Sequence, residues 1–122
     1  MAATAQARTA LGRWGEDVAA RFLVAAGLVI LDRNWRCELG EIDIVARNDD
    51  VLVVVEVKTR ATEIFGSPLE AVTWRKAARL RRLAARWLAE HPVSAREVRI
   101  DVVSVLVPHR GGPQVEHVQG VA

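Results

Sequence analysis

Two segments rich in valine and isoleucine, separated by a short acidic turn, constrain the fold of this chain more than any other feature. They read EIDIVAR (41–47) and VLVVVEVKT (51–59), with NDD (48–50) between them. β-Branched runs around such a turn are typical of a β-hairpin. Because side chains alternate along a strand, one face of the first strand is expected to enter the core. The residues expected on that face are Ile42, Ile44 and Ala46.

Charged residues interrupt both strands near the open end of this hairpin. A two-residue turn at Asp49 and Asp50, or a four-residue turn, would place Asp43 directly across from Glu56, with the two Cβ atoms about 5 Å apart. Lys58 then lies on the same face as Glu56, because it follows two positions later. A three-residue turn would shift the register and spoil this pairing. The spacing therefore predicts a small cluster of charges at one end of the hairpin.

Two carboxylates this close on an apolar sheet resist joint ionisation, since each raises the pKa of the other. A divalent cation such as Mg²⁺ or Mn²⁺ would compensate, because both ions prefer oxygen ligands. Lys58 would lower the net charge, hold or activate a water, or stabilise negative charge on a phosphate. The alternative is a solvated rim in which Asp43, Glu56 and Lys58 form only weak ion pairs. The combination on adjacent strands favours a site.

Two helical patterns flank the hairpin. Residues 9–26 carry apolar residues at three- and four-residue spacing, with Thr9 as a candidate N-cap and Gly27 as the residue that ends the helix. A second helix is expected to begin after a capping Ser67 and to run to about Glu90, ahead of a proline. The remaining expected elements are strands at 28–31 and 97–107, a short edge strand at 114–118, and a polar connection at 32–40.

This order of elements predicts an α/β fold, with a small mixed sheet flanked by helices. A chain of 122 residues is large enough for one core, so we expect a single domain at 9–118 between flexible segments at 1–8 and 119–122. Cys37 is the only cysteine, which excludes an internal disulfide and a Cys-rich zinc site. The apolar runs are far shorter than a membrane span and the N-terminus lacks a secretory h-region, so we expect a soluble cytoplasmic protein.

A longer composite of residues resembles a known family. Asp43 followed by Glu56-Val57-Lys58 resembles the PD-(D/E)-x-K nuclease signature, in which the acids lie on neighbouring strands. The fuller set resembles the YraN-like uncharacterised bacterial family, whose members are predicted endonucleases similar to archaeal Holliday-junction resolvases. The matching residues, spread over nearly the whole domain, are Gly15, Glu16, Asn34, Gly40, Glu41, Ile42, Asp43, Val55, Glu56, Val57, Lys58, Arg60, Phe65, Gly66 and Lys76.

The resemblance implies a restriction-endonuclease-like core. It also implies that Asp43 and Glu56 bind the metal, that Lys58 assists the attacking water, and that Glu16 is a further acid from the first helix. Ile42 stands where the signature has a proline. In the helical pattern itself, Glu16 falls off the centre of the apolar stripe, so a solvated helix acid is the competing interpretation.

Arginines recur along one face of the second helix. Arg75, Arg79, Arg82 and Arg86 follow four- and three-residue spacing, away from the apolar face. Such a stripe is either a phosphate-contact surface or a solubilising face. Lys76 lies nearer the apolar side, so it either extends to solvent or reaches toward the acids and the substrate. The family resemblance favours the second role.

Other candidates for contact with DNA lie near the ends of the predicted strands. Arg36, in the polar connection, and Arg60, after the third strand, are candidates for phosphate contacts. Trp35 would either stack on a base or pack at the core edge, and packing is the expected role. The three histidines show no metal-ligand spacing and are interpreted as incidental. Arg99 and Asp101 are expected to form a structural ion pair.

These features predict a metal-dependent DNA endonuclease that hydrolyses phosphodiester bonds. A preference for branched or single-strand-containing DNA follows from the family resemblance alone. Structure-specific cutting by so small a domain often requires a homodimer, for which an exposed valine-rich edge is a candidate surface. One alternative is a non-cleaving nucleic-acid-binding module that acts with a recombination, repair or DNA-uptake partner. The two acids and the lysine argue against this module, because a silent site tolerates their loss. The other alternative is a structural or interaction protein in which the acids form a solvated rim.

Overall fold

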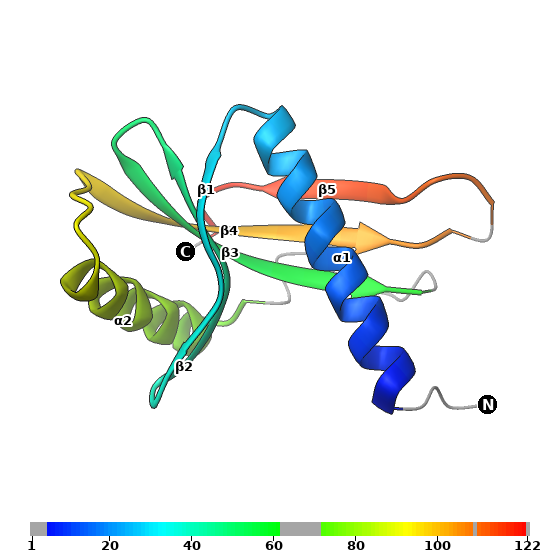
Figure 1. Ribbon diagram of the computed structural model, residues 1–122, viewed down its shortest axis with the longest axis horizontal. Coiled ribbons are helices and arrows are strands. Elements are labelled where there is room, and N and C mark those ends of the chain that lie inside the picture. The colour runs from blue at the N-terminus through cyan, green and yellow to red at the C-terminus, as the bar shows by residue number, and fades with distance from the viewer. Residues whose placement is uncertain (1–4, 62–71, 109, 122) are drawn as a thin grey trace.

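A five-stranded mixed β-sheet carries one helix on each of its faces (Figure 1). The protein is seen here as a computed structural model, in which the described residues are 5–61, 72–108 and 110–121. Its elements are α1 (Ala5–Ala25), β1 (Val29–Cys37), β2 (Gly40–Asn48), β3 (Val51–Arg60), α2 (Trp74–Glu90), β4 (Glu97–Leu106) and β5 (Gln114–Val118). The strands lie in sequence order, and all neighbours are antiparallel except β3 and β4.

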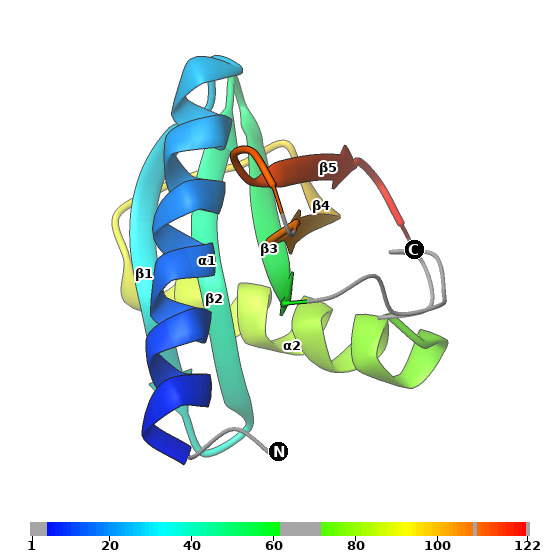
Figure 2. The same cartoon turned by 90° about the vertical axis from the view of Figure 1, so that its right-hand side faces the viewer.

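The parallel pair β3 and β4 is joined through α2, which crosses one face of the sheet while α1 lies on the other. Figure 2 shows that the two helices cross instead of running parallel. This arrangement confirms the predicted α/β class and is consistent with a small restriction-endonuclease-like core. Among the described residues, neither helix combines the length and the apolar character needed to span a membrane.

The valine-rich strand β3 lies at the centre of the sheet and separates two apolar clusters. Residues 51–55 are all buried, as expected for a strand that is covered on both faces. Val53 and Val55 pack in the cluster under α1, whereas Leu52 and Val54 pack in the cluster under α2. The edges of the sheet are β1 and β5. The valine-rich strand β3 is therefore not an exposed edge, so it does not offer the valine-rich edge considered as a dimer surface.

The register of the central hairpin is the one predicted for a two-residue turn. Residues of β2 and β3 are paired without interruption from the turn to Ile44, which lies opposite Val55. Asp49 has a φ of 54°, in the left-handed region that Asp tolerates in tight turns. The paired residues end one position before Asp43. The register predicted for the hairpin is therefore confirmed as far as Ile44 and Val55, but the predicted pair of Asp43 and Glu56 is not part of the ladder.

The alternation of side chains in β2 breaks at Asp43. Ile42 packs in the cluster under α2, whereas Ile44 and Ala46 pack in the cluster under α1. The prediction that all three share one face is therefore wrong for Ile42. At this point the Val57 N–H donates to Asp43 Oδ2 over 2.8 Å, beyond the last paired residues of the two strands. The Asp43 side chain thus accepts a bond from β3 in place of a backbone carbonyl, and the alternation of side chains in β2 changes at this residue.

The first helix and the strand after it are longer than predicted. α1 begins at Ala5, so Thr9 lies inside the helix and is not its N-cap. Gly27 follows the end of the helix with a φ of 97°, the left-handed conformation expected of a terminating glycine. β1 continues to Cys37 through residues predicted to be a polar connection. Because β1 is an edge strand with one partner, many of its side chains face solvent, which explains its polar sequence.

The second helix also begins at a different residue from the one predicted. Thr73 has an extended backbone, and its Oγ1 accepts from the Lys76 N–H over 3.2 Å, so it caps a helix that starts at Trp74. A helix that runs unbroken from Ser67 is therefore wrong, and Ser67 itself lies outside the described residues. The helix ends at Glu90 as predicted.

The residues after β5 are bonded to the sheet. Gly120 N–H donates to Asp101 Oδ1 over 3.0 Å, and Val121 N–H donates to the Ile100 carbonyl over 2.8 Å. These bonds hold a segment that was expected to be flexible against β4. Val121 also packs on the cluster under α2, which gives the end of the chain an apolar contact.

Candidate functional site

The N-terminal half of α1 approaches the end of β3 more closely than a side chain would allow. A Cβ atom at Gly15 would lie 1.9 Å from Thr59 Oγ1, so glycine is required at this contact. The next residue, Glu16, is thereby held beside the open end of the hairpin. Between α1 and the hairpin lies a cavity of about 370 Å³, called here the acid cavity. It is lined by Leu11, Gly12, Glu16, Asp43, Val57, Lys58 and Thr59.

Asp43 is the most perturbed acid of this cavity. Burial raises its pKa from 3.8 to about 7, and the hydrogen bond from the Val57 N–H only partly opposes this effect. The carboxylates of Glu56, Glu16 and Glu41 raise the pKa further. Asp43 therefore lies close to other acids, in an environment that disfavours its own negative charge.

Glu16 adds an unsatisfied oxygen to the same cavity. Its Oε1 is buried and accepts no hydrogen bond from the described residues. Arg33 Nη2 lies 3.8 Å away, too far for a hydrogen bond. Burial raises the pKa of Glu16, while Arg33 and a hydrogen bond with Asn34 lower it in part. The acid that the family resemblance selected is thus half-buried, with Oε1 fully buried in the cavity that Asp43 also lines, and is not the solvated helix acid of the competing interpretation.

Glu56 lies nearby but is held from the opposite side of the sheet. Its Oε1 is 2.5 Å from Lys76 Nζ, and both side chains are mostly buried. Lys76 therefore reaches toward the acids from the first turn of α2 and does not extend to solvent. Lys58 lines the acid cavity and has no ion-pair partner among the described residues. The structure thus brings together Glu16, Asp43, Glu56 and the two lysines of the chain.

The described residues contain no group of three His, Cys, Asp or Glu side chains arranged closely enough to hold a metal ion. The acids at the hairpin end are coupled in pairs: Asp43 shares the acid cavity with Glu16 and is affected electrostatically by Glu56. Any metal at this place would therefore take one or two carboxylates from the protein and complete its shell with other oxygen ligands.

The basic residues predicted to contact DNA are divided between two places. Arg36 lies in β1, and its Nε is 3.4 Å from Glu41 Oε2 across the β1–β2 pair. Arg60 is the last residue of β3. Arg75 and Arg79 are exposed on the first turns of α2, where they line a groove together with Lys76.

The arginine stripe of α2 is not uniform along its length. Arg86 forms ion pairs with Glu38 at 2.7 Å and with Glu90 at 2.8 Å, so its charge is neutralised. Arg75, Arg79 and Arg82 line the groove at the other end of the helix. Only the N-terminal part of the stripe is therefore available as a basic surface. Trp35 packs against the cluster under α2, as predicted.

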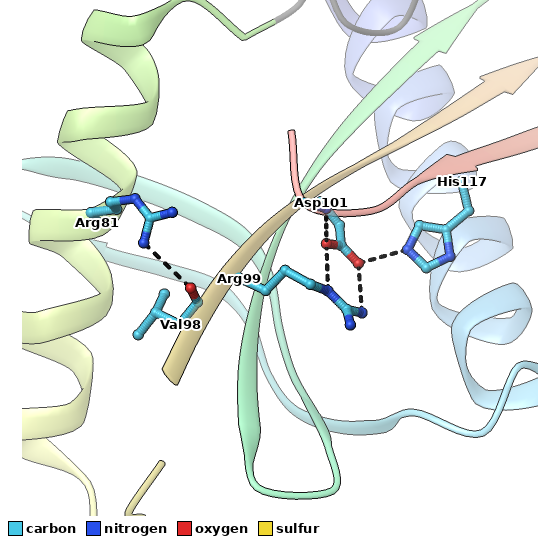
Figure 3. A network of polar contacts seen from close by, with 6 residues as sticks. Arg81, Val98, Arg99, Asp101 and His117 are labelled. Atoms are coloured by element: carbon cyan, nitrogen blue, oxygen red, sulfur yellow. Dashed lines mark hydrogen bonds and ion pairs between the residues drawn. The ribbon is translucent and has the colours of Figure 1, made fainter. Parts of the chain in front are cut away.

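A second buried acid, Asp101, has a structural role. Its oxygens accept from Arg99 Nε at 2.9 Å and Nη2 at 3.0 Å, from Gly120 N–H, and pair with His117 Nε2 at 2.7 Å (Figure 3). Burial alone would raise the pKa of Asp101, but these partners outweigh that effect and lower it. The predicted ion pair with Arg99 is confirmed. The interpretation of His117 as incidental is wrong, and only the parity of positions on neighbouring strands could have suggested the contact.

Comparison with known proteins assigns the chain to a family. The family model for "Uncharacterised protein family UPF0102" matches residues 15–105. The chain belongs to this family. A UPF0102 protein of Beutenbergia cavernae is 60% identical over 116 residues, which cover 95% of this chain and 98% of that protein. A UPF0102 protein of a Nocardioides species is 56% identical, and the match covers 98% of this chain and 96% of that protein. A UPF0102 protein of Streptomyces coelicolor is 59% identical, and the match covers 95% of this chain and 91% of that protein.

Membership of UPF0102 confirms the predicted assignment to the YraN-like uncharacterised family. The part of the chain that the family model matches begins at Gly15, the residue that presses α1 against β3. The matched region contains Glu16, Asp43, Glu56, Lys58 of the hairpin and Lys76 of α2. The charged residues of the candidate site therefore lie within the region that the UPF0102 model matches, whereas Leu11 and Gly12 of the acid cavity precede it.

Proposed function

We propose that this UPF0102 protein is a metal-dependent DNA endonuclease and that the acid cavity is its active site. The observation that carries the proposal is the buried Oε1 of Glu16, which accepts no hydrogen bond from the described residues and lines the same cavity as Asp43. A buried carboxylate oxygen that accepts no hydrogen bond, beside a second acid and 3.8 Å from Arg33 Nη2, is costly unless a ligand satisfies it. A cation supplies both the missing partner and the missing charge.

The residues of the acid cavity fit a small, hard cation. Mg²⁺ usually binds through one or two carboxylates and keeps waters and substrate phosphates as its other ligands. Asp43 and Glu16 line the cavity, and Glu56 is close enough to raise the pKa of Asp43. One or two of these acids, Asp43 with either Glu16 or Glu56, would hold Mg²⁺ or Mn²⁺, since no three of the described acids lie close enough together. Such an ion would lower the pKa of a water in the site and neutralise charge on a phosphate.

The two lysines have separate roles in this proposal. Lys58 lines the cavity without an ion-pair partner among the described residues, so its ammonium group is available to a phosphate oxygen or to a water. Lys76 holds the Glu56 carboxylate through the 2.5 Å contact between Nζ and Oε1. Asp43 is held in turn by the Val57 N–H. The chain thereby orients two acids and leaves one cation free for the substrate.

A nucleic-acid-binding module that does not cut is the second candidate, and one observation favours it. Within the part of the chain that the structure describes, no three metal-ligating side chains form a cluster. Glu56 is already neutralised by Lys76. A protein of this kind would keep the fold and the basic surface of α2 and would bind DNA without divalent ions.

Cleavage of an end-labelled four-way DNA junction and of a matched duplex, in Mn²⁺, Mg²⁺ or EDTA, distinguishes the two candidates. An endonuclease yields products only with the metal, and the rate should fall by about 100-fold or more in Asp43→Asn, Glu16→Gln and Lys58→Ala, the typical loss when one group that stabilises a transition state is removed. Asp49→Asn, at the exposed turn of the same hairpin, is the matched control and should cleave normally.

Two results would contradict the proposal. Products that persist in Asp43→Asn at the rate of the native chain would show that the acid cavity is not the source of the activity. Equal retardation of DNA in EDTA and in Mn²⁺, by the native chain and all three variants and without products, would identify a binding module. Calorimetric titration with Mn²⁺ adds a direct test, because Glu16→Gln should weaken binding of the ion while Asp49→Asn should not.

A further inference from the structure

The largest exposed aromatic side chain among the described residues lies at the start of α2. Trp74 is the first residue of the helix and is 77% exposed. The other three tryptophans pack against the apolar clusters. A tryptophan that leaves this much apolar surface in water gives up the stabilisation of burial, unless a partner covers the ring. The position is also outside the residues that the nuclease signature selected.

All the charged side chains that line the groove beside Trp74, among the described residues, are positive. Beside the ring lies a groove of about 510 Å³, called here the Trp74 groove. Its charged lining consists of Arg75, Lys76, Arg79 and Arg82. The Arg75 guanidinium carbon lies 5.6 Å from the centre of the Trp74 ring, over its face. Within residues 5–61, 72–108 and 110–121, no acidic side chain lines the groove.

An exposed flat ring beside a row of arginines is suited to a chain that carries both flat apolar groups and regularly spaced negative charges. Single-stranded DNA has this chemistry, since its bases stack on aromatic rings while its phosphates bind arginine. A DNA duplex does not offer the face of a base to Trp74, because its bases are stacked on one another. The groove therefore fits unpaired DNA better than paired DNA.

The Trp74 groove is directly connected to the acids of the hairpin. Lys76 lines the groove and also contacts Glu56 through its Nζ. We infer that the Trp74 groove binds a single-stranded segment of DNA, with one base stacked on Trp74, and thereby selects substrates with unpaired bases for the acid cavity. This inference rests on the proposed nuclease function for its purpose, but the binding itself requires neither a metal nor cleavage.

Binding is measured by fluorescence anisotropy in EDTA, with labelled oligo-dT of about 12 nucleotides, within the site size of single-strand binding proteins. Trp74→Ala should weaken binding of oligo-dT by about 5- to 150-fold, the usual effect of removing an aromatic ring that stacks on a base, and a duplex of equal length should lose much less. Trp74→Phe should keep most of the affinity. Arg79→Ala should reduce the salt dependence of log K by about 0.7, the contribution of one phosphate contact on a single strand.

Arg21→Ala is the matched control for the arginine, because Arg21 is exposed on α1, away from the groove. It should leave the affinity for oligo-dT within about twofold of the native value, as expected for a charge that makes no contact with a phosphate. Thermal unfolding of each variant shows that the fold is intact.

Three outcomes would overturn the inference. One is a Trp74→Ala variant with native affinity for oligo-dT. Another is an equal loss for single strand and duplex, which would indicate a charged surface without stacking. The third is equally tight binding of poly-glutamate, which would identify the groove as a site for an acidic peptide. Because EDTA suppresses cleavage, these results are independent of whether the acid cavity cuts DNA.

Discussion

Replacement of Asp43 by asparagine tests whether the hairpin end is a built site or a solvated rim. Asparagine keeps the shape of the side chain and an oxygen that can accept from the Val57 N–H, but it removes the charge. The folded state raises the pKa of Asp43 from 3.8 to about 7, so the folded chain holds this proton more tightly than the unfolded chain. The sign follows from linkage: ionisation of Asp43 lowers the stability of the fold as the pH rises from about 4 to about 7.

The magnitude follows from the gap between the two pKa values. At 1.36 kcal/mol per pH unit, a gap from 3.8 to about 7 corresponds to roughly 4 kcal/mol as an upper limit. Since Asp43 is only partly buried, a penalty of about 2–4 kcal/mol at pH 8 is expected. Asp43→Asn should therefore be more stable than the native chain at pH 8, and its advantage should shrink by about 2–3 kcal/mol at pH 5.

Urea unfolding in EDTA at pH 5, 6, 7 and 8 measures this difference directly. Asp49→Asn, at the exposed turn, should show no comparable trend. If Asp43→Asn were less stable than the native chain at pH 8, or if its effect were independent of pH, Asp43 would be a solvated rim acid and the argument for a cation would fail. Addition of Mn²⁺ should remove most of the variant's advantage, because an ion at about 100 times its Kd stabilises the native chain by about 2.7 kcal/mol and should bind the variant poorly.

Two further predictions concern the supports of the site. Gly15→Ala should lower the free energy of unfolding by about 1–3 kcal/mol, because the added Cβ clashes with Thr59. Gly12→Ala is the control: Gly12 lies on the same helix with open space around it, so the substitution should raise the free energy of unfolding by up to about 1 kcal/mol. Equal effects of the two substitutions in urea unfolding would contradict the close contact at Gly15. Asp101→Asn should cost about 3–5 kcal/mol near neutral pH by leaving Arg99 without its buried partner. Because the pKa of Asp101 is lowered in the fold, its contribution to stability is present above about pH 4 and is lost in stronger acid. The destabilisation by Asp101→Asn should therefore shrink below about pH 4. A destabilisation that is constant with pH would contradict the ionised network.

Much of the hairpin could be predicted from the sequence because its determinants are local. The acidic turn fixes the register, and a central strand that is covered on both faces requires a continuous apolar run such as residues 51–55. The register in turn brings Asp43 and Glu56 to the same end of the sheet. The break in alternation at Ile42 could not be predicted, because it depends on a bond between a side chain and the backbone of the next strand.

The errors at the ends of elements have similar causes. The sequence predicts a polar connection for most of β1, because an edge strand needs little apolar surface. Asp32 in this part accepts from the buried Trp87 Nε1 at 2.9 Å, a contact between distant parts of the chain that local patterns do not reveal. Thr73 and Ser67 are both good caps, and local propensity does not choose between them. Trp74 received no role because an isolated tryptophan in a helix pattern is usually a core residue. Only the surface of the folded chain shows that it is exposed.

The contrast between the two perturbed aspartates is the strongest reason to regard the hairpin end as a functional site. Asp101 is fully buried, yet Arg99, His117 and the Gly120 N–H satisfy it and lower its pKa. The same fold surrounds Asp43 with other acids and gives it one backbone N–H, so its pKa rises to about 7. A chain that neutralises one buried aspartate so completely is able to do so at the other. In the proposed function a ligand supplies the positive charge that Asp43 lacks, and the substitution by asparagine should recover the cost in stability of that missing charge.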